Sequence, residues 1–244
     1  MRRLNWEKAV DRNEENKALA LARFNQATDE WQRLRQTADE ERNIQADTRR
    51  RQYLAKDFST LIEYWTNVLA KSEYPDKFPR SGRFDYIAGD QSLTVTYQLP
   101  AITSLPQVGL VRYIESRNAL EEVPVSDVWL KHTYSELLVK IALRTLHELF
   151  QSDTADALTS IVFNGCVRSM DRSIGQEVSL LVISIEASKA EYSAINLAQV
   201  DPKACFNRFR GILSEDLASP APVVSVRSRS SNAPAAGDST SGIQ

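Results

Sequence analysis

Apolar residues recur at three- and four-residue spacing between Ser126 and Gln151, with charged residues in the intervening positions. The recurring set is Leu130, Tyr134, Leu137, Leu138, Ile141, Thr145 and Leu149. This period predicts an amphipathic helix with one buried face. Ser126 suits the N-cap, because its hydroxyl can accept a hydrogen bond from an unpaired amide of the first turn. Stretches that read as strands lie on both sides of it in the chain, so we expect this helix at the centre of the core.

Residues 4–71 also predict helix, because this segment contains neither proline nor glycine and is rich in Ala, Leu, Glu, Arg and Gln. Its apolar residues are sparse, but over about two heptad repeats they alternate between the a and d positions. The five residues of this seam are Phe24, Ala27, Trp31, Leu34 and Ala38. Two interpretations stay open: a coiled coil of modest stability, or a solvated stalk whose aromatic residues pack back on the domain. The denser apolar residues from Phe58 to Leu69 are expected to dock on the folded domain.

Strands are predicted after Pro79, the first two from alternating apolar and polar residues. The expected strands cover 84–86 and 93–99 around a Gly-Asp turn, 109–115 with a short partner at 120–123, and 159–167 with 177–186. Asp201 and Pro202 predict the start of a last helix, with Cys205, Phe206 and Phe209 facing inward.

The expected fold class is α+β. A long N-terminal helix of coiled-coil character precedes a small mixed domain, in which two β-hairpins flank a central amphipathic helix. The predicted boundaries are 1–56 for the charged helical stalk, 57–217 for the α+β domain and 218–244 for a disordered tail. The tail is predicted because Ser, Ala, Pro and Gly dominate after Leu217, a composition that cannot offset chain entropy by apolar burial.

Composition narrows the function classes. Of 244 residues, 42% are hydrophobic and 25% charged, with a formal net charge of -2 and a pI near 5.8. This balance gives no global attraction to nucleic acid or to an anionic membrane. No apolar run approaches the ~20 residues that span a bilayer, and the N-terminus does not read as a secretory signal. Cys166 and Cys205 are too few for a disulfide framework or a structural zinc site, so we expect a reducing cytoplasm and buried thiols.

Candidate chemistry is sparse. His132 and His147, both on the central helix, are separated by roughly 22 Å along its axis and cannot share a metal or a proton relay. No nucleophile elbow, P-loop, dinucleotide fingerprint or zinc-protease motif occurs. The sequence therefore assigns no catalytic, cofactor-binding or metal-binding residue.

The order of predicted elements is one that metal-dependent nucleases use, and such a site requires carboxylates and a lysine at set positions on the strands. Asp90 lies near the appropriate turn, and Glu115-Ser116-Arg117 follows the third strand. An arginine in place of the lysine cannot be deprotonated to help activate water. Glu15-Asn16-Lys17 has the required residue types but lies in the polar helix. An active nuclease centre is not expected.

The best local patch for nucleic acid is Arg49-Arg50-Arg51, with Lys56 close by and Arg33 and Arg35 upstream. Acidic residues interleave with these cations and reduce any attraction to phosphate. We interpret the patch as a solvated helix face, and the sequence names no residue that contacts nucleic acid.

Several phrases between Phe84 and Phe206 carry a family resemblance: FDY, LTVTYQLPAITSLPQV, RYIESR, KIALRTLHELFQSD, IVFNG and VDPKACF. They resemble the region that precedes the nuclease domain in Mrr-type restriction endonuclease proteins of bacteria. The similarity covers roughly residues 55–219. In those longer proteins a charged helix and an α+β domain come first, followed by a proline-containing linker and a catalytic domain. None of these phrases is a catalytic motif, so the resemblance transfers no functional residue.

This chain departs from that pattern after DLASPAPVV, residues 216–224, where the relatives run into the nuclease. We expect either a truncated remnant or a stand-alone accessory form. The resemblance implies a non-catalytic part of a Mrr-like protein of DNA restriction, which assembles or positions a nuclease on DNA. The expected partners are further copies through the N-terminal helix, a nuclease and DNA, with no membrane. The alternative is a coiled-coil protein-interaction module unrelated to restriction.

Overall fold

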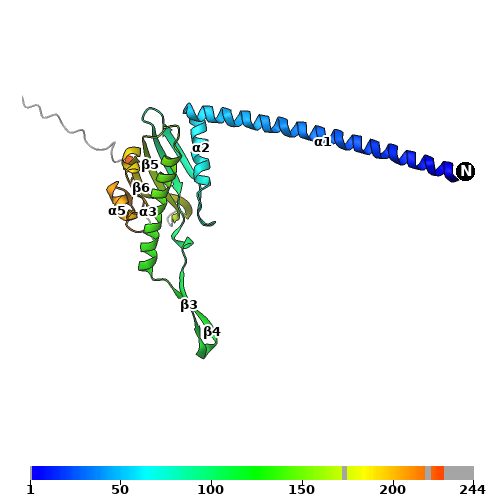
Figure 1. The fold of residues 1–244 in the computed structure, drawn as a ribbon. Helices are drawn as coiled ribbons and strands as arrows, with labels where there is room; N and C mark the ends of the chain where they lie inside the picture. The colour runs from blue at the N-terminus through cyan, green and yellow to red at the C-terminus, as the bar shows by residue number, and fades with distance from the viewer. Residues whose placement is uncertain (1, 172–174, 218–220, 228–244) are drawn as a thin grey trace, which may run out of the picture. The chain divides into compact units, whose positions relative to one another are not determined.

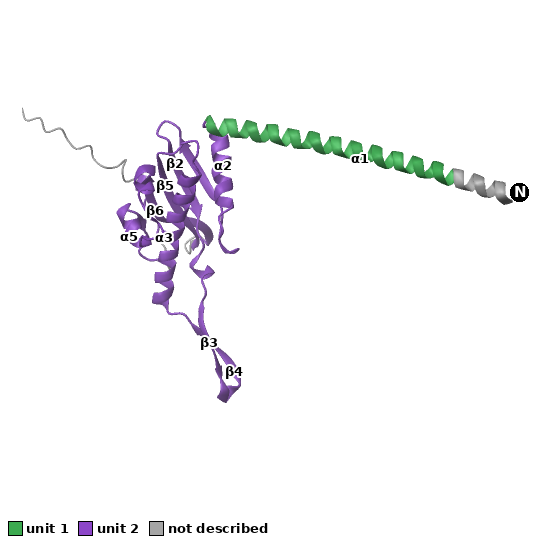
Figure 2. Cartoon of the chain, viewed as in Figure 1, with its two compact units in different colours: residues 1–55 green, residues 56–244 purple. Residues whose placement is uncertain are grey.

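The computed structural model describes residues 2–171, 175–217 and 221–227, and the side chains from residue 12 onward. The chain divides into two compact units, residues 1–55 and 56–244 (Figure 2). The expected mixed α+β fold with a long N-terminal helix is confirmed.

The first unit is a single helix, α1, which spans Arg2–Leu54. Residues 4–71, expected to be helix almost throughout, divide into two helices at Lys56, whose backbone has a φ of 58° and does not continue an α-helix. Asp57 then caps a new helix, because its carboxylate accepts hydrogen bonds from the Thr60 amide at 3.0 Å and the Ser59 hydroxyl at 2.6 Å. These hydrogen bonds, that of Ser59 first, lower the pKa of Asp57.

The second unit contains four helices, two 3₁₀ turns and seven strands among the described residues. The helical elements are α2 (Phe58–Ala70), η1 (Ile102–Ser104), η2 (Glu115–Arg117), α3 (Asp127–Ser152), α4 (Lys189–Ser193) and α5 (Pro202–Arg208). The strands are β1 (Gly82–Ile87), β2 (Ser92–Gln98), β3 (Val108–Ile114), β4 (Ala119–Pro124), β5 (Ser160–Asp171), β6 (Gln176–Ser188) and β7 (Ile212–Leu213). The predicted central helix is confirmed as α3, and the Ser126 hydroxyl accepts from the Trp129 amide at 3.2 Å.

Five strands form one sheet in the order β1-β2-β5-β6-β7, and β3 and β4 form a separate two-stranded sheet (Figure 1). Neighbouring strands in the larger sheet are antiparallel except for β2 and β5, which run parallel. A parallel pair needs a long crossover connection. Here the crossover contains η1, the β3–β4 ribbon and α3.

The core lies between α2, α3 and one face of the larger sheet. Period-two alternation sends Leu93, Val95 and Tyr97 of β2 toward the helices, and all three are buried. The indole ring of Trp65 on α2 meets the ring of Tyr86 edge-on, with centroids 5.4 Å apart. The docking expected for residues 58–69 is confirmed, because Leu61, Trp65 and Leu69 are buried.

Residues 221–227, which we call the strap, contact β6 and the sheet face opposite the helices, where Thr94, Asn164 and Ser184 lie beside the buried Val162. The Val223 amide donates to the Leu181 carbonyl at 2.8 Å, and the Val226 amide donates to the Ser184 hydroxyl at 3.1 Å. Arg227 donates to the Ser92 hydroxyl at 3.1 Å. The predicted disordered tail includes this segment, yet the strap is hydrogen-bonded to the sheet. The rest of that tail, 218–220 and 228–244, lies outside the described residues.

A buried carboxylate joins the end of α3 to the strands that follow it. Asp153 accepts hydrogen bonds from the amides of Ala157 and Leu158 at 2.9 and 3.0 Å. The Lys189 ammonium lies 2.8 Å from the Asp153 carboxylate and 2.8 Å from the exposed carboxylate of Asp156. The Asp153 side chain has no solvent-exposed area, so these donors depend on it.

We expect Asp153→Ala to destabilise the second unit by about 3 kcal/mol or more, because it leaves two buried amides without their acceptor and Lys189 without the buried one of its two carboxylates. Urea unfolding followed by circular dichroism measures this change. Asp156→Asn is the matched control: it removes an exposed carboxylate from the same lysine, and asparagine tolerates the positive φ at this position. Equal effects of the two substitutions would contradict the role given to Asp153.

The hydrogen bonds of the strap predict slow amide exchange at Val223 and Val226. We expect both amides to exchange at least about tenfold more slowly than in an unstructured peptide. Arg227→Ala should accelerate exchange at Val226, since it removes the contacts that hold the end of the strap to β2. Exchange at the unstructured-peptide rate at Val223 would show that the strap is not held in solution.

Candidate functional site

The structure does not bring the candidate nuclease residues together. Asp90 lies in the turn between β1 and β2, where Arg227 approaches its carboxylate to 3.7 Å. Glu115 and Arg117 lie in η2, at the tip of the β3–β4 ribbon. Within the described ranges, no group of three or more His, Cys, Asp and Glu side chains is placed to hold a metal ion.

The two histidines belong to separate environments on α3. His132 is exposed, and its Nε2 lies 3.8 Å from a carboxylate oxygen of Glu136 one turn on. The ring of His147 lies against Tyr192, with centroids 6.4 Å apart. As the spacing predicts, they share no partner in these contacts.

Glu148, the neighbour of His147, anchors the loop after α2. One carboxylate oxygen accepts from Arg144 Nε at 2.7 Å, and the other accepts from the Ser72 hydroxyl. Arg144 also donates to the Glu73 carbonyl at 3.0 Å, and its guanidinium lies 4.6 Å from the ring centroid of Tyr74. Burial, with the Glu148 charge second, raises the pKa of Tyr74. These contacts tie the loop after α2 to α3, so their role is structural.

Neither described thiol lies in an environment that favours its reactive thiolate form. Cys205 is buried in α5, and Cys166 is half-buried in β5. Burial raises the pKa of both thiols, so each stays protonated at neutral pH.

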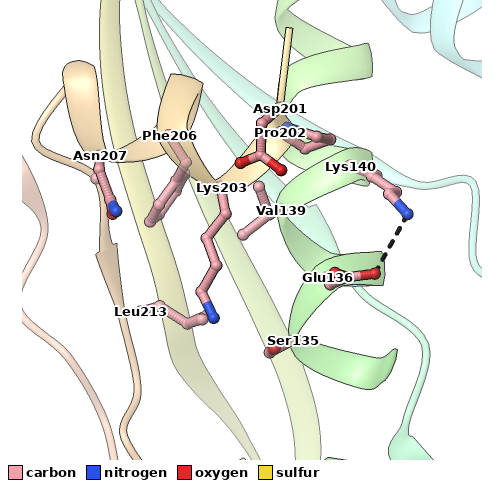
Figure 3. A pocket seen from close by; sticks show the side chains of 11 residues that line it. Ser135, Glu136, Val139, Lys140, Asp201, Pro202, Lys203, Phe206, Asn207 and Leu213 are labelled. Atoms are coloured by element: carbon pink, nitrogen blue, oxygen red, sulfur yellow. Dashed lines mark hydrogen bonds and ion pairs between the residues drawn. The ribbon is translucent and has the colours of Figure 1, made fainter. Parts of the chain in front are cut away.

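One hollow of about 480 Å³ opens between α3, α5 and β7 (Figure 3). Val139, Phe206 and Leu213 contribute its apolar lining, and its charged residues are Glu136, Lys140, Asp201 and Lys203. Lys140 pairs with Glu136 at 3.5 Å, and Asp201 caps α5 by accepting from the Ala204 amide at 2.7 Å. The hydroxyl of Ser135 donates to the His132 carbonyl at 2.8 Å. Glu136 and Lys140 thus engage each other, whereas Asp201 and Ser135 engage backbone groups.

The predicted basic patch lies on α1, where Arg49, Arg50 and Arg51 have exposed side chains. Elsewhere on this helix Arg42 pairs with Asp39 at 3.3 Å. The interleaving of charges is that of a solvated helix face, as the sequence indicates.

The seam is the most pronounced apolar feature of α1. The side chains of Phe24, Trp31 and Leu34 are 68%, 59% and 65% exposed, respectively. The guanidinium of Arg35 lies over the Trp31 ring at 5.4 Å from its centroid. These large apolar side chains of the seam are therefore exposed on α1.

Comparison with known proteins assigns no family: no family model matches the chain, and neither a curated protein nor a solved structure matches it significantly. In the part of the chain that the structure describes, no helix is both long and apolar enough to span a bilayer.

We expect the purified chain to leave methylated and unmethylated DNA intact in the presence of Mg²⁺ or Mn²⁺, because its carboxylates and lysines are not paired on adjacent strands as that chemistry requires. Gel analysis of supercoiled plasmid measures nicking and cutting. Cleavage that disappears in Asp90→Ala would overturn this expectation.

Proposed function

We propose that this chain is a non-catalytic part of a Mrr-like restriction protein, and that it assembles or positions a nuclease on DNA. Support for the restriction assignment comes from the phrases between Phe84 and Phe206. Support for an assembly role comes from the exposed seam of α1. The seam is the single observation that carries the assembly role, because it presents large apolar side chains at coiled-coil spacing.

Pairing of two copies through the seam has a favourable energy balance. Full burial of each large apolar side chain contributes roughly 1.5–3 kcal/mol. Each copy brings Phe24, Trp31 and Leu34 to the contact, and the small Ala27 and Ala38 let the helices approach closely. Six such side chains contribute roughly 9–18 kcal/mol against an association cost of roughly 4–15 kcal/mol or more, so the dimer is expected to be of moderate affinity.

The alternative is a coiled-coil interaction module with no link to restriction, and it uses the same seam. The reading frame that follows this one in the genome separates the two. A nuclease frame whose product co-purifies with the chain favours the restriction role. A neighbour of unrelated function favours the general module.

We expect Phe24→Ala combined with Trp31→Ala to weaken dimerisation at least about hundredfold, because each copy loses two of its large seam side chains. Sedimentation equilibrium at micromolar concentration measures the change. The matched control is Leu19→Ala with Ile44→Ala, which removes two large residues of the same helix that lie off the seam and are 59% and 64% exposed. A monomeric wild type, or equal weakening by both pairs of substitutions, would refute pairing through the seam.

A further inference from the structure

Opposite charges occupy the two ends of the seam on α1. The seam row that contains Trp31 begins one heptad before Phe24 with Lys17, and the other row ends one heptad after Leu34 with Glu41. Both charged side chains are exposed, and α1 runs without a break through both positions. A second helix that buries the seam therefore meets an ammonium at one end and a carboxylate at the other.

We propose that the seam binds the seam of a second copy with the two helices antiparallel, so that Lys17 of each copy lies opposite Glu41 of the other. Aligning these two residues also brings every member of one seam row level with a member of the other row. The resulting levels are 24 with 34, 27 with 31 and 20 with 38, and the two helices overlap over residues 4–54. This orientation rests on the pairing in the proposed function and deepens it, because it determines which way the partner runs.

Side-chain size supports this alignment. Trp31 comes level with the small Ala27 of the second copy, and Phe24 comes level with Leu34. Large side chains that face small ones interdigitate without voids. A parallel pair in register would place Trp31 against Trp31 and Ala27 against Ala27, so that wide and narrow layers would alternate along the contact.

The charges within the seam rows also separate the two orientations. A parallel pair in register would place Lys17 opposite Lys17 and Glu41 opposite Glu41, and like charges at such positions are unfavourable. The antiparallel pair replaces both layers by Lys17–Glu41 pairs, one at each end of the seam. The same four side chains therefore oppose one orientation and stabilise the other.

A flanking position adds a second opposite-charge pair. Glu14 and Arg42 both occupy heptad position e, and the e positions of two antiparallel helices flank the same side of the seam. In this alignment Glu14 of one copy lies two residues, or roughly 3 Å along the axis, from the level of Arg42 of the other. Arg42 is 76% exposed, and its ion pair with Asp39 at 3.3 Å is itself exposed, so the guanidinium can turn to Glu14.

One flanking contact opposes the antiparallel pair. Glu30 occupies position g, where it comes near Glu30 of the second copy, whereas a parallel pair would place it near Arg35. Over the described side chains, the antiparallel pair therefore has four opposite-charge contacts against this single like-charge contact. The parallel pair has two opposite-charge contacts against two like-charge layers. The Glu30 contact is also exposed to solvent and screened by salt, so charge selects the antiparallel pair.

Disulfide cross-linking of full-length chains reads the orientation directly. We expect a mixture of Lys17→Cys and Glu41→Cys chains to cross-link with oxidised glutathione, and only between the two different variants. Each variant alone should not cross-link, because its two introduced thiols lie roughly 36 Å apart along the antiparallel pair. The wild-type chain, with Cys166 and Cys205 alone, reports the background.

Charge reversal gives a second readout by sedimentation equilibrium. Lys17→Glu or Glu41→Lys alone should weaken the dimer about tenfold, because each makes both Lys17–Glu41 contacts repulsive. Both exchanges in one chain should restore the affinity to within about twofold, because the opposite charges then face each other again. The matched control is Arg33→Glu, which reverses a charge at the outward position c and should leave the affinity unchanged.

The outcomes distinguish orientation from pairing. Cross-linking within Lys17→Cys alone would show a parallel pair, in which Lys17→Glu only exchanges one like-charge layer for another and does not weaken the dimer. Either result would overturn the antiparallel orientation and leave pairing through the seam in place. A wild type that stays monomeric at micromolar concentration would instead remove the pairing on which this orientation rests.

Discussion

The parallel pairing of β2 with β5 is the constraint on which the second unit depends. Residues 92–98 pair with 160–166 in register, so the chain must return to the same end of the sheet before β5 begins. α3 supplies that return and buries its apolar face on the sheet while doing so. Two tyrosines fix its position, since Tyr134 donates to the Pro100 carbonyl at 2.7 Å and Tyr192 donates to the Leu143 carbonyl at 2.5 Å. α2 then packs beside α3, and β6 adds to the free edge of β5.

Periodicity predicts which segments are helices and strands, because it reports the one face that each buries. It does not report partners: β2 alternates and β5 begins with the buried run Ile161-Val162-Phe163, but neither pattern names the neighbouring strand. The break after α1 had a local signal in Asp57-Phe58-Ser59-Thr60, but uniform helix propensity on both sides obscured it. The strap was missed for a related reason. Composition counts apolar residues within a segment, whereas Val223 and Val226 are held by a carbonyl and a hydroxyl on β6.

Several acidic residues are committed to holding the fold together. Asp57 and Asp201 cap α2 and α5. The Asp153 carboxylate accepts hydrogen bonds from two amides and pairs with Lys189. The Glu148 carboxylate accepts from Arg144 and Ser72. Such uses follow from element boundaries and loop geometry, which sequence patterns locate least well. Sequence reasoning could therefore place the cap at Asp201 but not the acceptor roles of Asp153 and Glu148. The seam on α1, by contrast, could be predicted, because heptad spacing depends on one helix alone.

A comparison of energies indicates how the seam behaves when a partner is present. The stacking of Arg35 on Trp31 is an exposed cation–π contact, worth about 0.5–1 kcal/mol. Burial of the same indole against a second helix contributes about 1.5–3 kcal/mol. Burial therefore outweighs stacking and favours association, and the long aliphatic part of Arg35 can stay beside the ring while its charged end reaches solvent. Arg35 thus covers part of Trp31 in the single helix without competing with the partner that the heptad spacing favours.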